Sequence, residues 1–137
     1  LDLIQLHGDE SPAYIDELRR IIAPTVKIVK AIGFSGARAV APHPWNEYVA
    51  QADYLLCDTY DPVHHGGTGR LFDHSGLADD FPVSRAFLAG GLNPDNVSGL
   101  VSSLRPYAVD VSQGVEEAPG RKSHGLVEAF LTAAKSV

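Results

Sequence analysis

Arg85-Ala-Phe-Leu-Ala-Gly-Gly-Leu-Asn-Pro-Asp-Asn-Val97 is an apolar run that ends in two adjacent glycines, and Tyr107-Ala-Val-Asp-Val-Ser-Gln-Gly-Val115 has a similar form. Each stretch predicts a buried strand whose carboxyl end delivers a turn of backbone N–H groups. The turns are Gly90-Gly91 in the first stretch and Ser112-Gln113-Gly114 in the second. Because glycine has no Cβ, an anion can approach such backbone closely. The two turns therefore predict a site for the phosphate group of a small metabolite.

Three further apolar runs precede these two. The five predicted strands are Asp2–Leu6, Val26–Ala31, Tyr54–Cys57, Ala86–Ala89 and Ala108–Val111. Their starts lie roughly 22 to 32 residues apart, a spacing typical of repeated strand–helix units. Continuous apolar runs are typical of parallel strands that are covered on both faces. The sequence thus predicts an α/β fold, and adjacent phosphate-binding turns after the last two strands are typical of a (β/α)8 barrel.

Helices are predicted between the strands. Ser11-Pro12 and Asn93-Pro94 each place a capping residue before a proline suited to the first helical position. The last helix is expected from about Ser123. A helix from about Ser35 must end before Pro42, which leaves a second short turn around Trp45.

The composition excludes several classes of protein. The chain has 137 residues, enough for one domain with its own core. A formal net charge of −6 argues against a nucleic-acid surface. No apolar run approaches the roughly 20 residues that cross a bilayer, so no membrane contact is expected. One cysteine, Cys57, excludes an internal disulfide and favours the cytoplasm.

Asp58 is the first candidate for chemistry because it follows the apolar run 54–57, at the end of a strand where barrel active sites lie. A half-buried carboxyl there can have a raised pKa and act as a general acid near neutral pH. Alternatively, Asp58 only caps the loop that follows, and the sequence leaves both interpretations open. Since side chains alternate along a strand, Cys57 points toward the helices if Asp58 points toward the mouth. Cys57 is therefore interpreted as a packed, inert thiol.

Three other polar side chains are predicted near the same mouth. His7 ends the first strand and can act as an acid or base near neutral pH, although a hydrogen bond to a neighbouring loop is slightly favoured. Gln5 shares a face with His7 and faces the same cavity. Asp110 lies inside an apolar strand, and a buried carboxylate needs a partner. Contact with a ligand is favoured there over a purely structural hydrogen bond.

The stretch from residue 60 to residue 81 is irregular. It contains His64-His65, which lack the spacing of a helical metal site, and no metal is predicted. Gly66-Gly67-Thr68-Gly69 predicts a loop and is weak support for an anion site. Arg121 and Lys122, near the last helix, are expected to be solvated.

Four blocks of sequence, in order along the whole chain, resemble phosphoribosylanthranilate isomerase. They are Gln5-Leu6-His7-Gly8-Asp9-Glu10; Leu56-Cys57-Asp58-Thr59 with 66–69 and Phe72-Asp73; 89–97; and 109–116 with Pro119-Gly120. The resemblance implies a (β/α)8 barrel enzyme of tryptophan biosynthesis. Its reaction is the Amadori rearrangement of N-(5′-phosphoribosyl)anthranilate to 1-(2-carboxyphenylamino)-1-deoxyribulose 5-phosphate. This is an aldose–ketose isomerisation that needs no cofactor.

The resemblance also implies roles for individual residues. Asp58 matches the general acid that protonates the ribose ring oxygen and opens the ring to a Schiff base. The turns at 90–91 and 112–114 match the phosphate clamp. Asp110 matches an aspartate that touches the sugar. Gln5 and Gly67 are expected to contact the substrate, and His7 is an auxiliary catalytic candidate.

Two parts of the family's site have no counterpart in this sequence. They are the cysteine base of the first strand and an arginine for the anthranilate carboxylate. We therefore expect residues 1–137 to supply strands four to eight of one barrel, without the first three βα units. The isolated chain would be inactive, because five strands cannot close an eight-stranded barrel. Its partner would be the missing N-terminal part, in the same chain or in a companion chain.

Two alternatives remain open from the residues alone. One is a phosphate-binding module in which the acid has lost its function. The other is a five-stranded, flavodoxin-like domain that binds a nucleotide where the strand order reverses.

Overall fold

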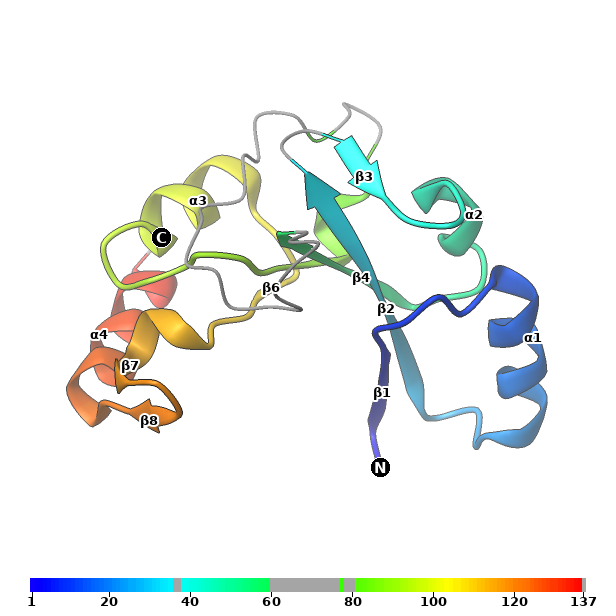
Figure 1. Cartoon of the computed structure of the whole chain (residues 1–137), viewed down its shortest axis with the longest axis horizontal. Coiled ribbons are helices and arrows are strands. Elements are labelled where there is room, and N and C mark those ends of the chain that lie inside the picture. Colours follow the sequence, from blue (N-terminus) through cyan, green and yellow to red (C-terminus); the bar gives the residue numbers. More distant parts are fainter. Residues whose placement is uncertain (36–37, 60–76, 78–80, 137) are drawn as a thin grey trace.

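The computed structural model of the chain describes residues 1–35, 38–59, 77 and 81–136. Its main sheet contains five parallel strands: β1 (Leu3–Leu6), β2 (Lys27–Ser35), β4 (Tyr54–Thr59), β5 (Ala86–Leu88) and β6 (Ala108–Val109). Neighbours in the sheet follow the order of the chain, β1-β2-β4-β5-β6 (Figure 1). A flavodoxin-like domain requires a reversal of strand order. The flavodoxin-like alternative is therefore wrong.

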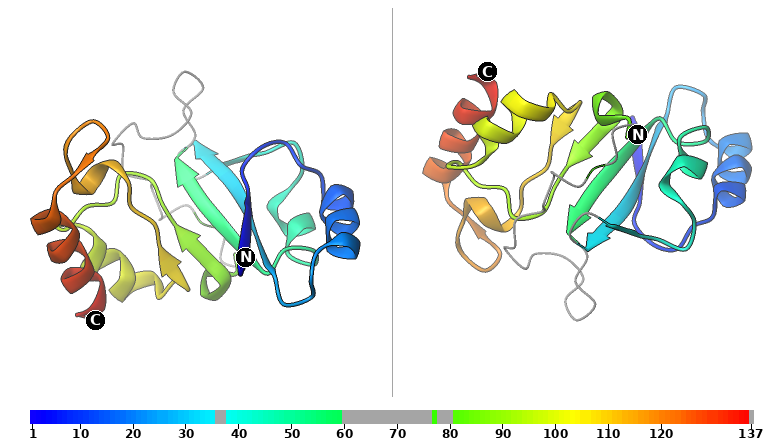
Figure 2. Two further views of the ribbon diagram at one scale, coloured as in Figure 1. Left: turned by 90° about the horizontal axis from the view of Figure 1, so that it is seen from below. Right: turned by 90° about the horizontal axis from the view of Figure 1, so that it is seen from above.

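Helices lie beside both halves of this sheet, with the strands between them (Figure 2). Toward β1 lie α1 (Pro12–Ile21) and α2 (Trp45–Tyr48), and toward β6 lie α3 (Val97–Leu104) and α4 (His124–Lys135). Two short 3-10 turns, η2 (Val83–Arg85) and η3 (Gln113–Val115), complete the described helical elements. None of the helices in the described ranges has the length and apolar character needed to cross a membrane.

The side chains of the parallel strands divide between two buried layers. Those that face the helices form the larger core, which includes Ile28, Leu55 and Leu88. Those that alternate with them form a second cluster on the opposite, inner face, with Val29, Ala31, Leu56 and Ala89. This two-sided burial explains why the central strands β2, β4 and β5 are mainly apolar.

The segment after β2 differs from the sequence prediction. A helix is predicted from about Ser35, but β2 continues to that residue and pairs antiparallel with β3 (Arg38–Val40). Phe34 supplies the reason, because its buried ring packs edge-on against Phe81 with 6.0 Å between ring centres. Burial of this ring outweighs a weak local preference for helix. The predicted turn around Trp45 is confirmed as α2.

The predicted start of α1 is confirmed, and that of α3 is not. The Ser11 hydroxyl accepts the N–H of Tyr14 at 3.2 Å, as an N-cap does. α3 begins only at Val97, after the predicted Asn93-Pro94. The side chain of Asn93 accepts the N–H groups of Asp95 and Asn96 at 2.9 and 3.1 Å. An asparagine side chain that accepts backbone N–H groups two and three residues later stabilises a turn. Residues 93–96 therefore form a turn, and the helix begins after it.

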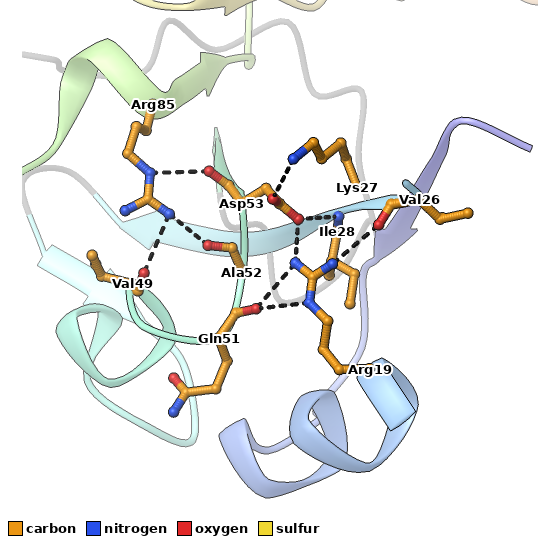
Figure 3. Close-up of polar contacts among 9 residues, drawn as sticks. All are labelled: Arg19, Val26, Lys27, Ile28, Val49, Gln51, Ala52, Asp53 and Arg85. Carbon is orange, nitrogen blue, oxygen red and sulfur yellow. Dashed lines mark hydrogen bonds and ion pairs between the residues drawn. The ribbon is translucent and has the colours of Figure 1, made fainter. Parts of the chain in front are cut away.

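A polar cluster around Asp53 joins α1 to the amino ends of the strands (Figure 3). Arg19 of α1 pairs with the Asp53 carboxylate, which also accepts Lys27 Nζ at 3.1 Å and the N–H of Ile28 at 2.9 Å. Arg85 donates to the Asp53 carbonyl oxygen at 3.0 Å. Burial alone would raise the pKa of Asp53, but these hydrogen bonds outweigh it and lower the pKa from 3.8 to about 2. The cluster lies at the opposite end of the strands from the predicted site.

Candidate active site

Asp58 lies near the carboxyl end of β4, on the inner face of the sheet. Leu56 belongs to the inner cluster and Cys57 to the helix-facing core, so alternation places Asp58 on the inner face. One oxygen, Oδ1, accepts the N–H of Thr59 at 2.7 Å, a contact that the loop-capping interpretation predicts. The other, Oδ2, accepts no hydrogen bond from any residue the structure describes. Among the described residues, this carboxyl oxygen is therefore left without a donor.

Cys57 is a packed thiol, as predicted. Its side chain is fully buried, and burial raises its pKa to about 12. A thiol in this environment stays protonated at neutral pH and is a poor nucleophile or base.

The first glycine turn begins directly beside Asp58. Gly90 and Gly91 have φ angles of +86° and +67°, which side chains other than glycine rarely adopt. A Cβ on Gly90 would lie 2.9 Å from the backbone nitrogen of Thr59 and 3.2 Å from Asp58 Oδ1. Within the described ranges, the N–H groups of both glycines have no acceptor. Asn96 holds this turn by donating its side-chain N–H to the Gly91 carbonyl at 3.0 Å.

The second turn packs directly against the first. A Cβ on Gly114 would overlap the carbonyl oxygen of Leu92 and would lie 3.1 Å from the Cα of Asn93. Gln113 begins the 3-10 turn η3 directly after Ser112. The first N–H groups of a helical turn have no acceptor within it. The structure thus brings the two predicted phosphate turns into contact, and Asp58 lies beside the first of them.

Gln5 and His7 lie at the end of β1. Gln5 Nε2 is 2.9 Å from His7 Nδ1, so the two side chains share a face as predicted, and both are exposed. Leu6 pairs with Lys30 of β2, and Asp58 pairs with Gly33. At about 4.8 Å per strand and 3.3 Å per residue, this register separates His7 from Asp58 by on the order of 10 Å. The two side chains are too far apart for direct contact.

Asp110 departs from the prediction. β6 ends at Val109 rather than Val111, and Asp110 follows it as an exposed residue. The reason is that β6 is an edge of the described sheet, so no further strand covers Asp110. The prediction of a buried carboxylate that needs a partner is therefore wrong. Its backbone N–H donates to the Leu88 carbonyl at 2.8 Å, which keeps it in line with β5. Gly67 and His64-His65 lie outside the described residues.

Lys30 is a buried charge that sequence reasoning missed. It is 1% exposed, and its ammonium donates to Gly8 O at 2.7 Å, Ala31 O at 3.0 Å and Glu10 Oε2 at 3.2 Å. It also lies 5.4 Å from the ring centre of Tyr48. Burial would raise the pKa of Glu10, but backbone hydrogen bonds and Lys30 lower it. Lys30 therefore anchors the loop that follows β1. The available signal was a lysine flanked by apolar residues, Val29 and Ala31, in the middle of a predicted strand.

The profile of the N-(5'phosphoribosyl)anthranilate (PRA) isomerase family matches residues 1–133. The chain belongs to this family. The isomerase of Geobacter sp. (strain M21) is 46% identical over 137 residues, which are 100% of this chain and 62% of that protein. The isomerase of Microcystis aeruginosa is 42% identical over 96% of this chain and 60% of its own length. The chain thus spans about six tenths of the length of these relatives.

Solved structures of the family resemble this fold. Phosphoribosylanthranilate isomerase from Thermus thermophilus has a TM-score of 0.73 and 31% identity, over 97% of this chain and 60% of its own. Another isomerase, solved with reduced 1-(o-carboxyphenylamino)-1-deoxyribulose 5-phosphate, has a TM-score of 0.60 and 31% identity, over 100% and 61%. The α/β fold with a mainly parallel sheet is therefore that of phosphoribosylanthranilate isomerases.

Proposed function

We propose that this chain carries the acid and the phosphate site of a phosphoribosylanthranilate isomerase of tryptophan biosynthesis. The convergence of the turns at 90–92 and 112–114 beside Asp58 is the observation that carries this proposal. The relative solved with a reduced ribulose 5-phosphate compound supports a phosphorylated sugar joined to anthranilate as the substrate. The reaction converts N-(5′-phosphoribosyl)anthranilate to 1-(2-carboxyphenylamino)-1-deoxyribulose 5-phosphate.

In the proposed mechanism, protonated Asp58 gives its proton to the ribose ring oxygen. The bond between C1′ and that oxygen breaks, and the anilino nitrogen supplies the electron pair that forms a cationic Schiff base. The positive charge acidifies the proton on C2′, which a base removes to give an enolamine. Tautomerisation to the ketone completes an isomerisation in which no atom is gained or lost. Cys57 cannot be this base, because its thiol is buried against the helices with a pKa near 12.

The binding roles follow the order of the strands. Backbone N–H groups of Gly90, Gly91, Gln113 and Gly114, with the Ser112 hydroxyl, bind the phosphate. Asp110 and Gly67 contact the sugar portion, and Gln5 with His7 contacts the substrate from the β1 end. His7 and Asp58 are separated by on the order of 10 Å. They are therefore placed to contact two different parts of one extended sugar phosphate, and not to act on the same reacting atom. No cofactor takes part.

The five parallel strands correspond, in this proposal, to strands four to eight of the family's barrel, so residues 1–137 form its C-terminal portion. β1 and β6 are then the edges at which the remaining three βα units pair, whether in the same chain or in a companion chain. Those units would supply the base, and we expect no turnover without them. A biosynthetic enzyme with one buried, reduced cysteine suits the cytoplasm.

A completed barrel tests this proposal. The first three βα units of the Geobacter sp. isomerase can be joined to this chain and the turnover measured. In that protein, Asp58→Asn should lower kcat by roughly 10²- to 10⁴-fold and leave the affinity for inorganic phosphate within about twofold. A non-catalytic phosphate module predicts no turnover in either protein. Turnover by the 137-residue chain alone would disprove the need for an external base.

A further inference from the structure

A short hairpin follows the second phosphate turn and leads into α4 (Figure 1). It consists of β7 (Glu116–Ala118) and β8 (Arg121–Lys122), in which Glu116 pairs with Lys122 across the strands. Gly120, at φ +77°, makes the tight turn between the strands. The hairpin therefore brings a residue ten positions later in the chain back to Ser112.

Lys122 is exposed, as the sequence predicts, but this hairpin also holds its side chain in place. Its side chain is 46% exposed. Its ammonium nonetheless donates to Ser112 O at 2.8 Å, to Ser112 Oγ at 3.2 Å and to Glu116 Oε1 at 2.7 Å. An ammonium group has three N–H donors, so all three are engaged. No donor of Lys122 remains for a ligand.

Glu116 fixes the position of the Lys122 ammonium. Its second oxygen, Oε2, accepts the N–H of Gly120 at 3.1 Å, so both carboxylate oxygens are tied to the hairpin. The hydrogen bond from Lys122, followed by that from Gly120, lowers the pKa of Glu116. The carboxylate therefore stays ionised at neutral pH and keeps the ammonium beside Ser112.

The contacts with Lys122 determine where Ser112 and Gln113 can donate. Because Ser112 Oγ accepts from Lys122, its own O–H hydrogen is left to donate, and it has no acceptor in the described part of the chain. The Ser112 carbonyl points toward the ammonium. The peptide unit is planar and trans, so the N–H of Gln113 must point in the opposite direction. The direction of the Gln113 N–H is thus set before any ligand arrives, and the Ser112 O–H hydrogen is left to point away from Lys122.

We infer that Lys122 is a positioning residue of the phosphate site. Held by Glu116, it orients the Ser112 hydroxyl and the Gln113 N–H toward a phosphate monoester and does not touch the phosphate itself. Donors oriented in advance bind more tightly because less conformational freedom is lost on binding. The inference rests on the proposed function, since it takes the 112–114 turn to be part of the phosphate site.

A phosphate titration of the ¹⁵N-labelled protein tests the inference. Inorganic phosphate is the probe, and the amide signals of Gly90, Gly91 and Gln113 report binding. Lys122→Met should raise the Kd by roughly three- to tenfold, the effect of losing about one net hydrogen bond. Arg121→Met is the matched control, because it removes the same charge from the same strand. The Arg121 side chain pairs with Glu117 at 2.7 Å and has no hydrogen bond with Ser112, so the Kd should change less than twofold.

A double-mutant cycle shows whether Lys122 acts through Ser112. Lys122→Met should have a much smaller effect in a Ser112→Ala background than in the parent protein. Glu116→Gln gives a second route should Lys122→Met disturb the hairpin, and it should also raise the Kd. The amide signals of Val115 and Ser123, whose backbones are hydrogen-bonded at 2.9 Å, report the hairpin.

Each outcome separates the inference from the function on which it rests. Equal losses for Lys122→Met and Arg121→Met would overturn the inference in favour of general charge attraction. Additive effects of Lys122→Met and Ser112→Ala would overturn an action through Ser112. No phosphate-dependent shift at these amides in the parent protein would overturn the proposed phosphate site itself.

Discussion

Replacing Asp53 by asparagine tests the polar cluster that joins α1 to the sheet (Figure 3). The pKa of Asp53 falls from 3.8 to about 2 in the folded protein, a difference of about 1.8 units. At about 1.4 kcal/mol per pKa unit, this difference corresponds to about 2.5 kcal/mol at pH 7. The side chain is 21% exposed, and allowing for screening by solvent leaves a contribution of about 2 kcal/mol to the free energy of unfolding. Asparagine should remove most of the contribution.

The effect should depend on pH in a definite direction. Because the folded pKa lies below the unfolded one, the contribution is present above the unfolded value of 3.8 and is lost as the pH falls toward 2. Urea unfolding of the parent and Asp53→Asn proteins at pH 7, 5, 4 and 3 would measure it. The difference in unfolding free energy should be about 2 kcal/mol at pH 7 and should shrink below pH 4.

Glu117→Gln is the matched control, since it breaks an ion pair with Arg121 whose side chains are 48% and 73% exposed. It should change the unfolding free energy by less than about 0.5 kcal/mol. A difference for Asp53→Asn below that level at pH 7, or one that stays constant from pH 7 to pH 3, would refute the reasoning.

Three further predictions concern packing around the site. The Cys57 thiol should react with iodoacetamide at pH 8 at least about a hundredfold more slowly in the native protein than in urea, because burial raises its pKa to about 12; equal rates would contradict this. Gly114→Ala should lower the urea-unfolding free energy by roughly 1–3 kcal/mol, since its Cβ overlaps Leu92. Gly99→Ala in α3, where a Cβ meets nothing within 4 Å, should instead raise it. Lys30→Met should lower the free energy by roughly 1–3 kcal/mol, because two carbonyls lose their donor, and an unchanged thermal midpoint would exclude that role.

The features that could be predicted are those set by neighbours in the chain. Each of the five parallel strands overlaps a predicted apolar run, because burial within a sheet selects such runs, although β2 continues to Ser35 and β6 ends at Val109. The Ser11 cap and the glycine turns could be predicted because each requires a particular residue type in a particular local backbone conformation. Alternation along the strand correctly linked two side chains: because Asp58 lies on the inner face, Cys57 is packed against the helices.

The errors arose where distant residues decide the local outcome. Phe34 continues β2 because Phe81, far along the chain, covers its ring. Asp110 is exposed because no strand lies beyond β6 in the described sheet. No window of sequence around these residues contains the partner that determines their state.

The sequence by itself determined the strands, their parallel α/β class, the family, and the residue types of the acid and the phosphate turns. Tertiary structure alone decided that Gly114 packs against Leu92, that Gly90 lies beside Asp58, and that Lys30 is buried under the loop after β1. The physical reason is that apolar patterns and glycine conformations act over a few residues. Contacts between strand ends and paired charges instead depend on how the whole sheet places them.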